Sequence, residues 1–121
     1  RVTTLIGAET AAQVADRFAL IEVDQIRVKG KSLPASCFAL LGDEALRTDA
    51  DFVDASREIA SLIAAYRAQR WDKARAVLAS ATAARKIGLD GLLSVYEARI
   101  AEFGANPPPA DWDGVYDAVR K

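Results

Sequence analysis

The chain has 121 residues, with 16 lysines and arginines against 17 aspartates and glutamates, and a formal net charge of -1. This length excludes a two-domain enzyme, and the balanced charge disfavours a general nucleic-acid binder or a polybasic membrane surface. The absence of histidine excludes Ser-His-Asp and Cys-His nucleophile systems and most zinc chemistry, while a single cysteine excludes an internal disulfide.

The first 42 residues predict a helix followed by an antiparallel β-hairpin. Apolar residues first recur at helical spacing and then alternate in the manner of a strand. The alternation changes phase around Asp24-Gln25, which predicts a β-bulge there. The predicted elements are a helix over 8–18, a strand over 19–28, a turn over 29–34 and a strand over 35–41.

From residue 43 onward the sequence predicts α-helices. Thr48 and Asp51 have the spacing of a capping box, with Thr48 as the N-cap of the first helix. A break at Gln69-Arg70 precedes the second helix, Gly88 ends it, and Asp90 can cap a third. The residues predicted to face the core are Phe52, Ala55, Ile59, Leu62, Ile63 and Tyr66 in the first helix, Trp71, Ala74, Leu78 and Ala81 in the second, and Leu92, Leu93, Tyr96, Ile100 and Phe103 in the third.

One stretch of the helical region has the spacing of a repeat unit. Tyr66, Trp71, Ala74 and Leu78 are placed much as in a tetratricopeptide unit, in which an aromatic residue of one helix faces an alanine of the next. A single unit cannot form a solenoid. An ordinary helical hairpin and a peptide-binding helical repeat therefore both remain open.

The last segment follows three prolines at 107–109. Trp112, Val115, Tyr116 and Val119 keep helical spacing, which predicts a short final helix. This helix has too little apolar surface to stand alone, so we expect Trp112 to be at least half buried against the preceding helices.

Several polar residues have a structural interpretation. The acidic residues between Asp43 and Glu58 lie at a helix start, where carboxylates favour the helix dipole, and they lack EF-hand spacing. Cys37 lies in a predicted strand and is interpreted as a small buried thiol. The basic residues interpreted as a solvated face are Arg67, Arg70, Lys73 and Arg75.

The segment Arg27-Val-Lys-Gly-Lys31 carries a different signal. It places the ammonium groups of Lys29 and Lys31 at a hairpin bend, where Gly30 lets the backbone approach a ligand. Such an arrangement suits a triphosphate, whose negative charge needs neutralising without proton transfer. A solvated basic turn is the alternative.

Several segments along the chain occur in a characteristic order. They are Val2-Thr-Thr-Leu-Ile-Gly7-x-Glu9-Thr10, Phe18-x-Leu20, Arg27-Val-Lys-Gly-Lys31-x2-Pro34 and Phe38-x-Leu-Leu41, then Tyr66-Arg67-x3-Trp71-x2-Ala74, Tyr96-x2-Arg99-Ile100 and Pro108-Pro109-x-Asp111-Trp112-Asp113-Gly114-Val115-Tyr116. The first four resemble the end of a class III adenylate/guanylate cyclase catalytic domain. The others resemble the C-terminal extension of bacterial cyclases that carry a CHASE2 sensor.

The resemblance implies an α+β fold in two parts. Residues 1–42 would be the last α-β-β piece of the catalytic domain, and residues 43–121 a helical, tetratricopeptide-like extension. Since methionine is absent and Arg1 comes first, we expect this chain to be the C-terminal piece of a longer protein. In that protein, ATP, with GTP as the second candidate, would be converted to the 3′,5′-cyclic nucleotide and pyrophosphate.

The resemblance also implies where the chemistry lies. The aspartates that hold Mg²⁺ or Mn²⁺ would precede Arg1, so this chain alone would hold no cofactor and would not be catalytic. Lys29 would contact the β- and γ-phosphates, with Lys31 as a second contact. The implied partners are a nucleoside triphosphate and the missing N-terminal catalytic portion.

The implied setting is the cytoplasmic region of a membrane-anchored, homodimeric bacterial signalling protein. The chain itself would contact neither nucleic acid nor the membrane. The alternative is a non-enzymatic helical module that binds a peptide or a partner helix.

Overall fold

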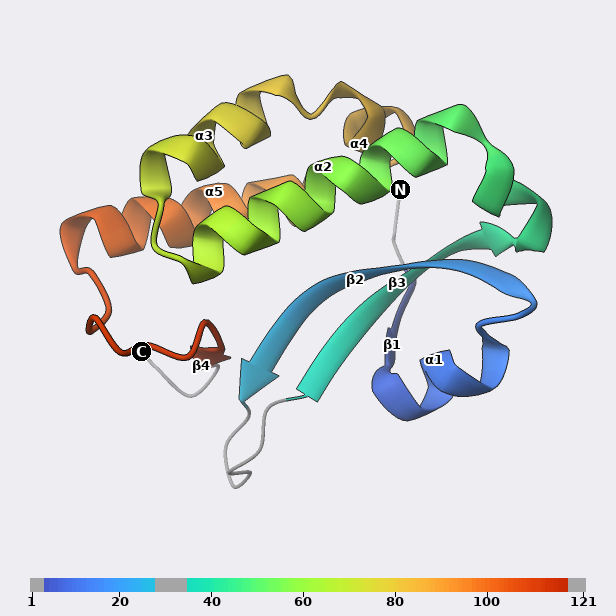
Figure 1. Cartoon of the computed structure of the whole chain (residues 1–121), viewed down its shortest axis with the longest axis horizontal. Helices are drawn as coiled ribbons and strands as arrows, with labels where there is room; N and C mark the ends of the chain where they lie inside the picture. The colour runs from blue at the N-terminus through green and yellow to red at the C-terminus, as the bar shows by residue number, and fades with distance from the viewer. Residues whose placement is uncertain (1–3, 28–34, 118–121) are drawn as a thin grey trace.

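The structure is a computed structural model and describes residues 4–27 and 35–117. The long helices that follow the hairpin cover one face of a small, twisted sheet, and the first helix lies on the other side, so the fold is α+β as expected (Figure 1). The sheet order is β1-β3-β2-β4, in which β1, β3 and β2 pair antiparallel and the short β4 pairs parallel to β2. The strands are β1 (Thr4–Gly7), β2 (Phe18–Arg27), β3 (Ala35–Asp43) and β4 (Tyr116–Asp117).

The first helix lies between β1 and β2, and all the other helices follow β3. The helices are α1 (Ala8–Val14), the 3-10 helix η1 (Glu44–Thr48), α2 (Ala50–Arg67), α3 (Trp71–Ser80), α4 (Thr82–Lys86) and α5 (Asp90–Ala105). No helix in the described part of the chain combines the length and the apolar character that a membrane crossing needs.

The predicted hairpin is present with its bulge. β2 and β3 pair from Phe18↔Asp43 to Ile26↔Ala35. The register shifts between Glu22 and Asp24, which leaves one extra residue on β2 close to the predicted position. The first helix is shorter than predicted, because α1 ends at Val14 and Phe18 already belongs to β2.

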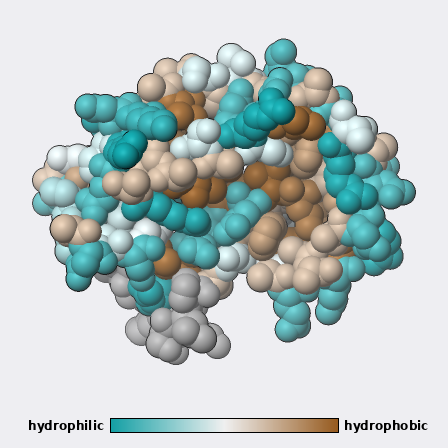
Figure 2. Space-filling view, in the orientation of Figure 1, coloured by the Kyte–Doolittle hydropathy of each residue, from teal (hydrophilic) through white to brown (hydrophobic). Residues whose placement is uncertain are grey.

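The main core lies between the sheet and the helical layer. The alternate β2 residues Ala19, Ile21 and Val23 are buried beneath the helices. All six α2 residues that were predicted to face the core are buried, which confirms the helical periodicity as a guide to packing. In the view of Figure 2, apolar side chains gather where the surface is hollowed between α2 and β2, while hydrophilic side chains occupy the outer surface of the helices.

Four predictions about the helices after the hairpin are wrong. Asp49, not Thr48, caps α2, because its carboxylate accepts hydrogen bonds from the backbone N–H groups of Asp51 and Phe52. The predicted second helix is interrupted at Ala81, so that α3 and α4 are separate. Asp90 begins α5 without capping it, and the predicted final helix is absent from the described residues.

Candidate functional site

The predicted hairpin turn carries Lys29 and Lys31, and both lysines lie outside the described residues. The structure describes the two strands that lead to this turn, as far as Arg27 on β2 and from Ala35 on β3. The described part of the candidate site is therefore the base of the hairpin, where β2 and β3 approach this segment. Asp24 and Arg27 of β2 lie at this base, and Arg99, Asp113 and Tyr116 contact it from other parts of the chain. We call these five residues together the hairpin base.

A largely buried ion pair joins β2 to α5. The guanidinium of Arg99 donates to both carboxylate oxygens of Asp24, at 2.9 Å each, and the two side chains are only 11% and 14% exposed. The ring of Tyr116 packs against the guanidinium, with its centroid 3.9 Å from the Cζ atom. Burial disfavours the charged form of Arg99, but the hydrogen bonds and charge of Asp24 outweigh it and raise the pKa of Arg99. Removing one partner of such a pair costs about 3–5 kcal/mol, so the contact fixes the hairpin against α5.

The C-terminal segment fastens the same base from the other edge. Asp113 accepts a hydrogen bond from the Arg27 guanidinium at 2.7 Å, and Tyr116 pairs with Ile26 in the parallel β4–β2 ladder. The hydrogen bond from Arg27, and a second from the backbone N–H of Val115, hold the pKa of the Asp113 carboxyl below its usual value. The end of β2 is thus held by α5 on one side and by the C-terminal segment on the other.

A cluster of four rings ties this C-terminal segment to the helices. We call it the aromatic seam: Tyr66, Trp71, Phe103 and Trp112. The ring centroid of Trp112 lies 5.3 Å from those of Tyr66 and Phe103, and Trp71 lies 5.5 Å from Phe103. The backbone carbonyl of Pro109 accepts a hydrogen bond from the Gln69 side chain at 2.8 Å. Trp112 is partly buried against the core, which confirms the predicted burial.

The predicted helix at Trp112 is replaced by a turn that feeds β4. Gly114 has φ +81°, and a Cβ atom there would lie 2.7 Å from Cγ of Arg67. The carboxylate of Asp113 accepts from the backbone N–H of Val115, and the Trp112 indole donates to the Val115 carbonyl. These side-chain hydrogen bonds compete with helical backbone hydrogen bonds, which explains why this segment does not form the predicted helix.

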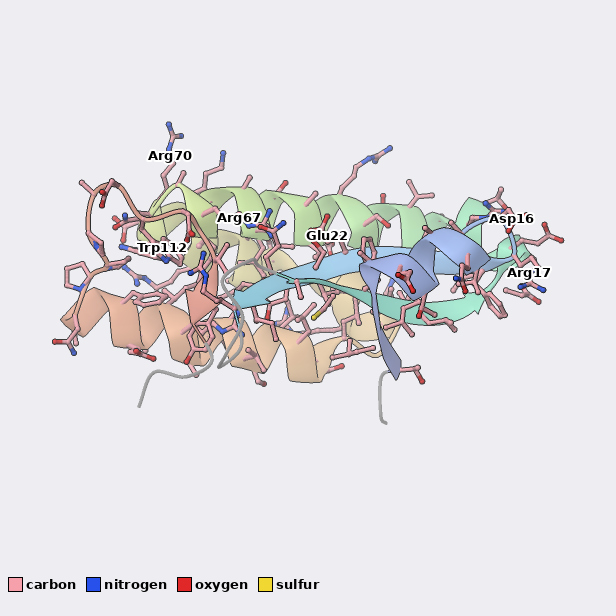
Figure 3. All side chains as sticks on the ribbon, turned by 90° about the horizontal axis from the view of Figure 1, so that it is seen from below. Asp16, Arg17, Glu22, Arg67, Arg70 and Trp112 are labelled. Carbon is pink, nitrogen blue, oxygen red and sulfur yellow. The ribbon has the colours of Figure 1, made fainter. Side chains whose placement is uncertain are left out.

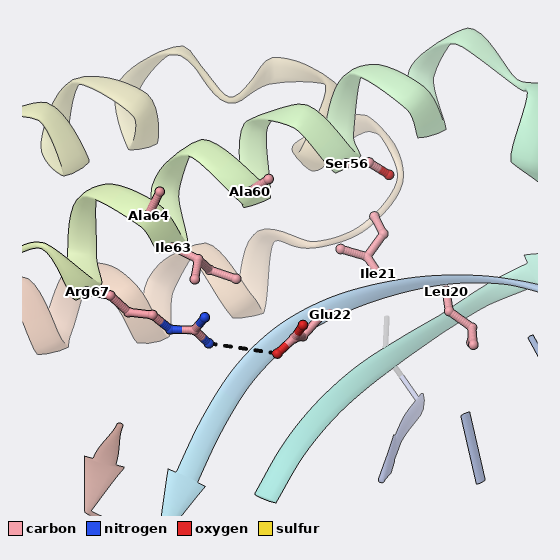
Figure 4. A pocket seen from close by; sticks show the side chains of 8 residues that line it. All are labelled: Leu20, Ile21, Glu22, Ser56, Ala60, Ile63, Ala64 and Arg67. Carbon is pink, nitrogen blue, oxygen red and sulfur yellow. Dashed lines mark ion pairs between the residues drawn. The ribbon is translucent and has the colours of Figure 1, made fainter. Parts of the chain in front are cut away.

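Arg67 was interpreted as part of a solvated face, and this interpretation is wrong. Its aliphatic stem packs against Gly114 in the C-terminal segment that follows Pro109, which we call the tail. Its guanidinium turns toward Glu22, whereas Arg70 points away from the protein (Figure 3). Arg67 and Glu22 lie at one end of a cleft of about 410 Å³ between α2 and β2 (Figure 4). The distance of 3.9 Å between Nη2 and Oε2 makes this a loose, partly exposed ion pair. Ser56, Ala60 and Ala64 line the α2 side of the cleft, so it offers room but no acid–base pair for catalysis.

The other singled-out polar residues have structural roles. Cys37 is partly buried in β3, and burial raises the pKa of its thiol. Of the acidic residues, Glu58 accepts hydrogen bonds from the backbone N–H groups of Ala83 and Ala84 and so caps α4. Within 4–27 and 35–117, no group of three or more acidic or cysteine side chains could hold a metal ion.

Two buried tyrosines predict how stability responds to alkaline pH. Burial raises the pKa of Tyr66 from 10.0 to about 12, although the nearby positive charge of Arg99 opposes it. Burial also raises the pKa of Tyr96, whose hydroxyl donates to the Val23 carbonyl at 2.7 Å. The unfolded chain therefore loses these protons first. The free energy of unfolding should be fully retained below about pH 10 and should fall toward pH 12, by about 1.4 kcal/mol per pH unit for each group.

Denaturant titrations between pH 8 and pH 12, with tyrosinate absorbance recorded in parallel, measure this fall. The Tyr66→Phe variant should lose stability less steeply, since it has one fewer buried group to ionise. A flat stability over this range, or the same slope in the variant, would contradict the assignment.

The chain matches no protein-family model, no curated protein and no solved structure in the comparisons made. Two features of the structure bear on the function: the order of the elements and the contacts around the hairpin. Both the order of the elements and these contacts involve the strands on either side of the segment that carries Lys29 and Lys31.

Proposed function

We propose that this chain closes the catalytic domain of a nucleotidyl cyclase and continues into a helical extension. The longer protein would convert ATP, with GTP as the second candidate, into the 3′,5′-cyclic nucleotide and pyrophosphate. The observation that supports this best is the succession β1, α1, β2, β3, in which the two strands of a long antiparallel hairpin flank the segment that carries Lys29-Gly-Lys31. The helix and the two strands of this order agree with the α-β-β piece that the cyclase resemblance implies.

In this proposal the hairpin supplies charge to the substrate rather than a proton. Lys29 contacts the β- and γ-phosphates, and Lys31 is a secondary contact. Mg²⁺ or Mn²⁺ would be held by aspartates in the preceding catalytic portion. A phosphate-binding lysine is most effective on a rigid support, and the hairpin base provides one through the Asp24–Arg99 and Arg27–Asp113 contacts.

The helical extension has a supporting role in this account. α5 holds the hairpin through Arg99, and the tail holds it through Asp113 and β4. Movements of the helices would thus reach the residues next to Lys29 directly. We place the chain in the cytoplasmic part of a homodimeric, membrane-anchored signalling protein.

The alternative, a helical module that binds a peptide at a tetratricopeptide-like seam, has weaker support. The aromatic seam that such a peptide would use is filled by the chain's own Trp112, which touches Tyr66, Trp71 and Phe103. A binding groove for a partner would have to release the tail first. This occupation favours a structural role for the seam.

Cyclic-nucleotide formation tests the proposal. Purified residues 1–121 should form no cyclic nucleotide from ATP or GTP with Mg²⁺ or Mn²⁺, whereas the longer protein with its preceding catalytic portion should. Chromatographic separation of the nucleotides after incubation measures both. Turnover by residues 1–121 that survives rigorous purification, or an inactive longer protein, would overturn the proposal.

A further inference from the structure

A second cavity, distinct from the cleft of Figure 4, lies between α5 and the β1–β3 side of the sheet. Its volume is about 440 Å³. Small residues of β3, such as Ala39, form its floor, and Leu92 and Val95 of α5 form its roof. Leu5 of β1 lies at one end and Arg99 at the other. We call this cavity the β1–α5 slot.

Two exposed apolar residues border the slot. Among the residues that the structure describes, the exposed large hydrophobic side chains are Leu5, at 59%, and Val95, at 44%. They come from elements far apart in the sequence, and yet both line this one cavity. Isolated exposed apolar residues are ordinary, whereas two that border the same apolar cavity indicate an interaction surface.

The strand beside the slot also has an unpaired edge. β1 pairs with β3 through Thr4↔Leu40 to Gly7↔Cys37. In the sheet order of the described residues β1 is the end strand, so its other edge presents N–H and C=O groups without a ladder partner. Such an edge can accept another strand, as in β-augmentation.

The charges in the slot specify which side chains the occupant carries. Asp24 and Arg99 are the charged residues of its lining, and they neutralise one another in their bidentate pair. An additional charge in the slot would have no counter-ion and would be costly to bury. The side chains that enter must therefore be uncharged and apolar.

The unpaired edge and the apolar slot together require one kind of occupant. A helix or a small ligand could fill the slot but could not pair with β1. We propose that the β1–α5 slot binds an extended polypeptide strand, which continues the sheet at β1 and inserts large apolar side chains beneath α5. This inference depends on the contacts of the slot and not on the cyclase proposal.

A labelled peptide is the probe for this test. It has valine at alternate positions, threonine between them and a lysine at each end, so that one face is apolar and the ends are soluble. Its binding to the 121-residue chain is followed by fluorescence anisotropy, and ¹⁵N–¹H spectra of the labelled chain report whether Thr4–Gly7 respond. Two further peptides carry N-methyl groups on one or the other set of alternate amides, which removes hydrogen bonding along one edge at a time.

Two glycines of α5 provide a matched pair of variants. Gly91 lines the slot and Gly104 does not, and a Cβ atom at either position meets nothing within 4 Å. Gly91→Leu should fill the slot and weaken binding at least about tenfold, while Gly104→Leu should leave the Kd within about twofold. Leu5→Lys, a change at an exposed position, should weaken binding as well.

The inference also predicts that only one of the two N-methylated peptides loses binding. Equal binding by wild type and Gly91→Leu, or no binding of the unmethylated peptide below about 1 mM, would overturn it. Sedimentation of the chain alone provides a further check. If wild type forms a dimer that Gly91→Leu converts to a monomer, the occupant is a second copy, and the inference of a separate strand is wrong.

Discussion

Replacing Trp112 with alanine is expected to lower the free energy of unfolding by about 3–5 kcal/mol. The indole is in contact with the other three members of the aromatic seam, and it donates to the Val115 carbonyl at 3.1 Å. Its loss leaves a cavity where the tail, α2, α3 and α5 meet. For a chain of this size the midpoint of thermal unfolding should fall by more than about ten degrees, measured by circular dichroism or calorimetry.

Trp112→Phe is the matched control, because it keeps an aromatic ring in the seam and loses only the indole hydrogen bond. Its midpoint should lie much closer to that of the wild type. If Trp112→Ala unfolds at the wild-type temperature, the tail does not stabilise the helices. The seam would then be open to a partner, and the alternative of an interaction module would gain support.

The packing of the helices could be predicted well from the sequence. The apolar positions of α2 recur at helical spacing, and the predicted residues from Phe52 to Tyr66 are all buried. Tyr66 and Trp71 lie on either side of the break at Gln69, and their ring centroids are 5.9 Å apart. Periodicity succeeds here because burial of one continuous face determines the packing of a long helix.

The ends of the helices and the tail were harder to predict. Thr48 and Asp49 are both good N-cap residues, and the choice between them depends on η1, where the Thr48 hydroxyl donates to the Ala45 carbonyl. The tail has helical spacing, but Gly114 packs against Arg67 at a positive φ, and β2 offers it a free edge. Spacing within the tail carries no information about these distant partners.

The contacts of the hairpin base were missed for the same reason. Asp24 and Arg99 are 75 residues apart, and Arg27 and Asp113 are 86 apart. One local signal existed, since Arg99 lies three residues after the buried Tyr96 and directly before the buried Ile100. A charged residue so close to a core face indicates a buried partner, but it does not identify which carboxylate. The predicted phosphate ligands, Lys29 and Lys31, lie outside the described residues and remain a prediction.

The rate of cyclic-nucleotide formation by Lys29 variants tests the central claim most directly. In the proposed longer cyclase, Lys29→Ala removes a positive charge that is proposed to stabilise the phosphates in the transition state. The loss should be about 2–3 kcal/mol, or roughly a hundredfold in rate. Lys31→Ala is the matched control, because it removes the same charge two residues along the turn, and its effect should be markedly smaller.

Steady-state rates at saturating nucleoside triphosphate, with the thermal midpoint of each variant recorded, separate this effect from a loss of folded protein. We expect a rate about a hundredfold lower for Lys29→Ala, at an unchanged midpoint. Equal and negligible losses for Lys29→Ala and Lys31→Ala would contradict the phosphate role and leave the segment as a solvated turn.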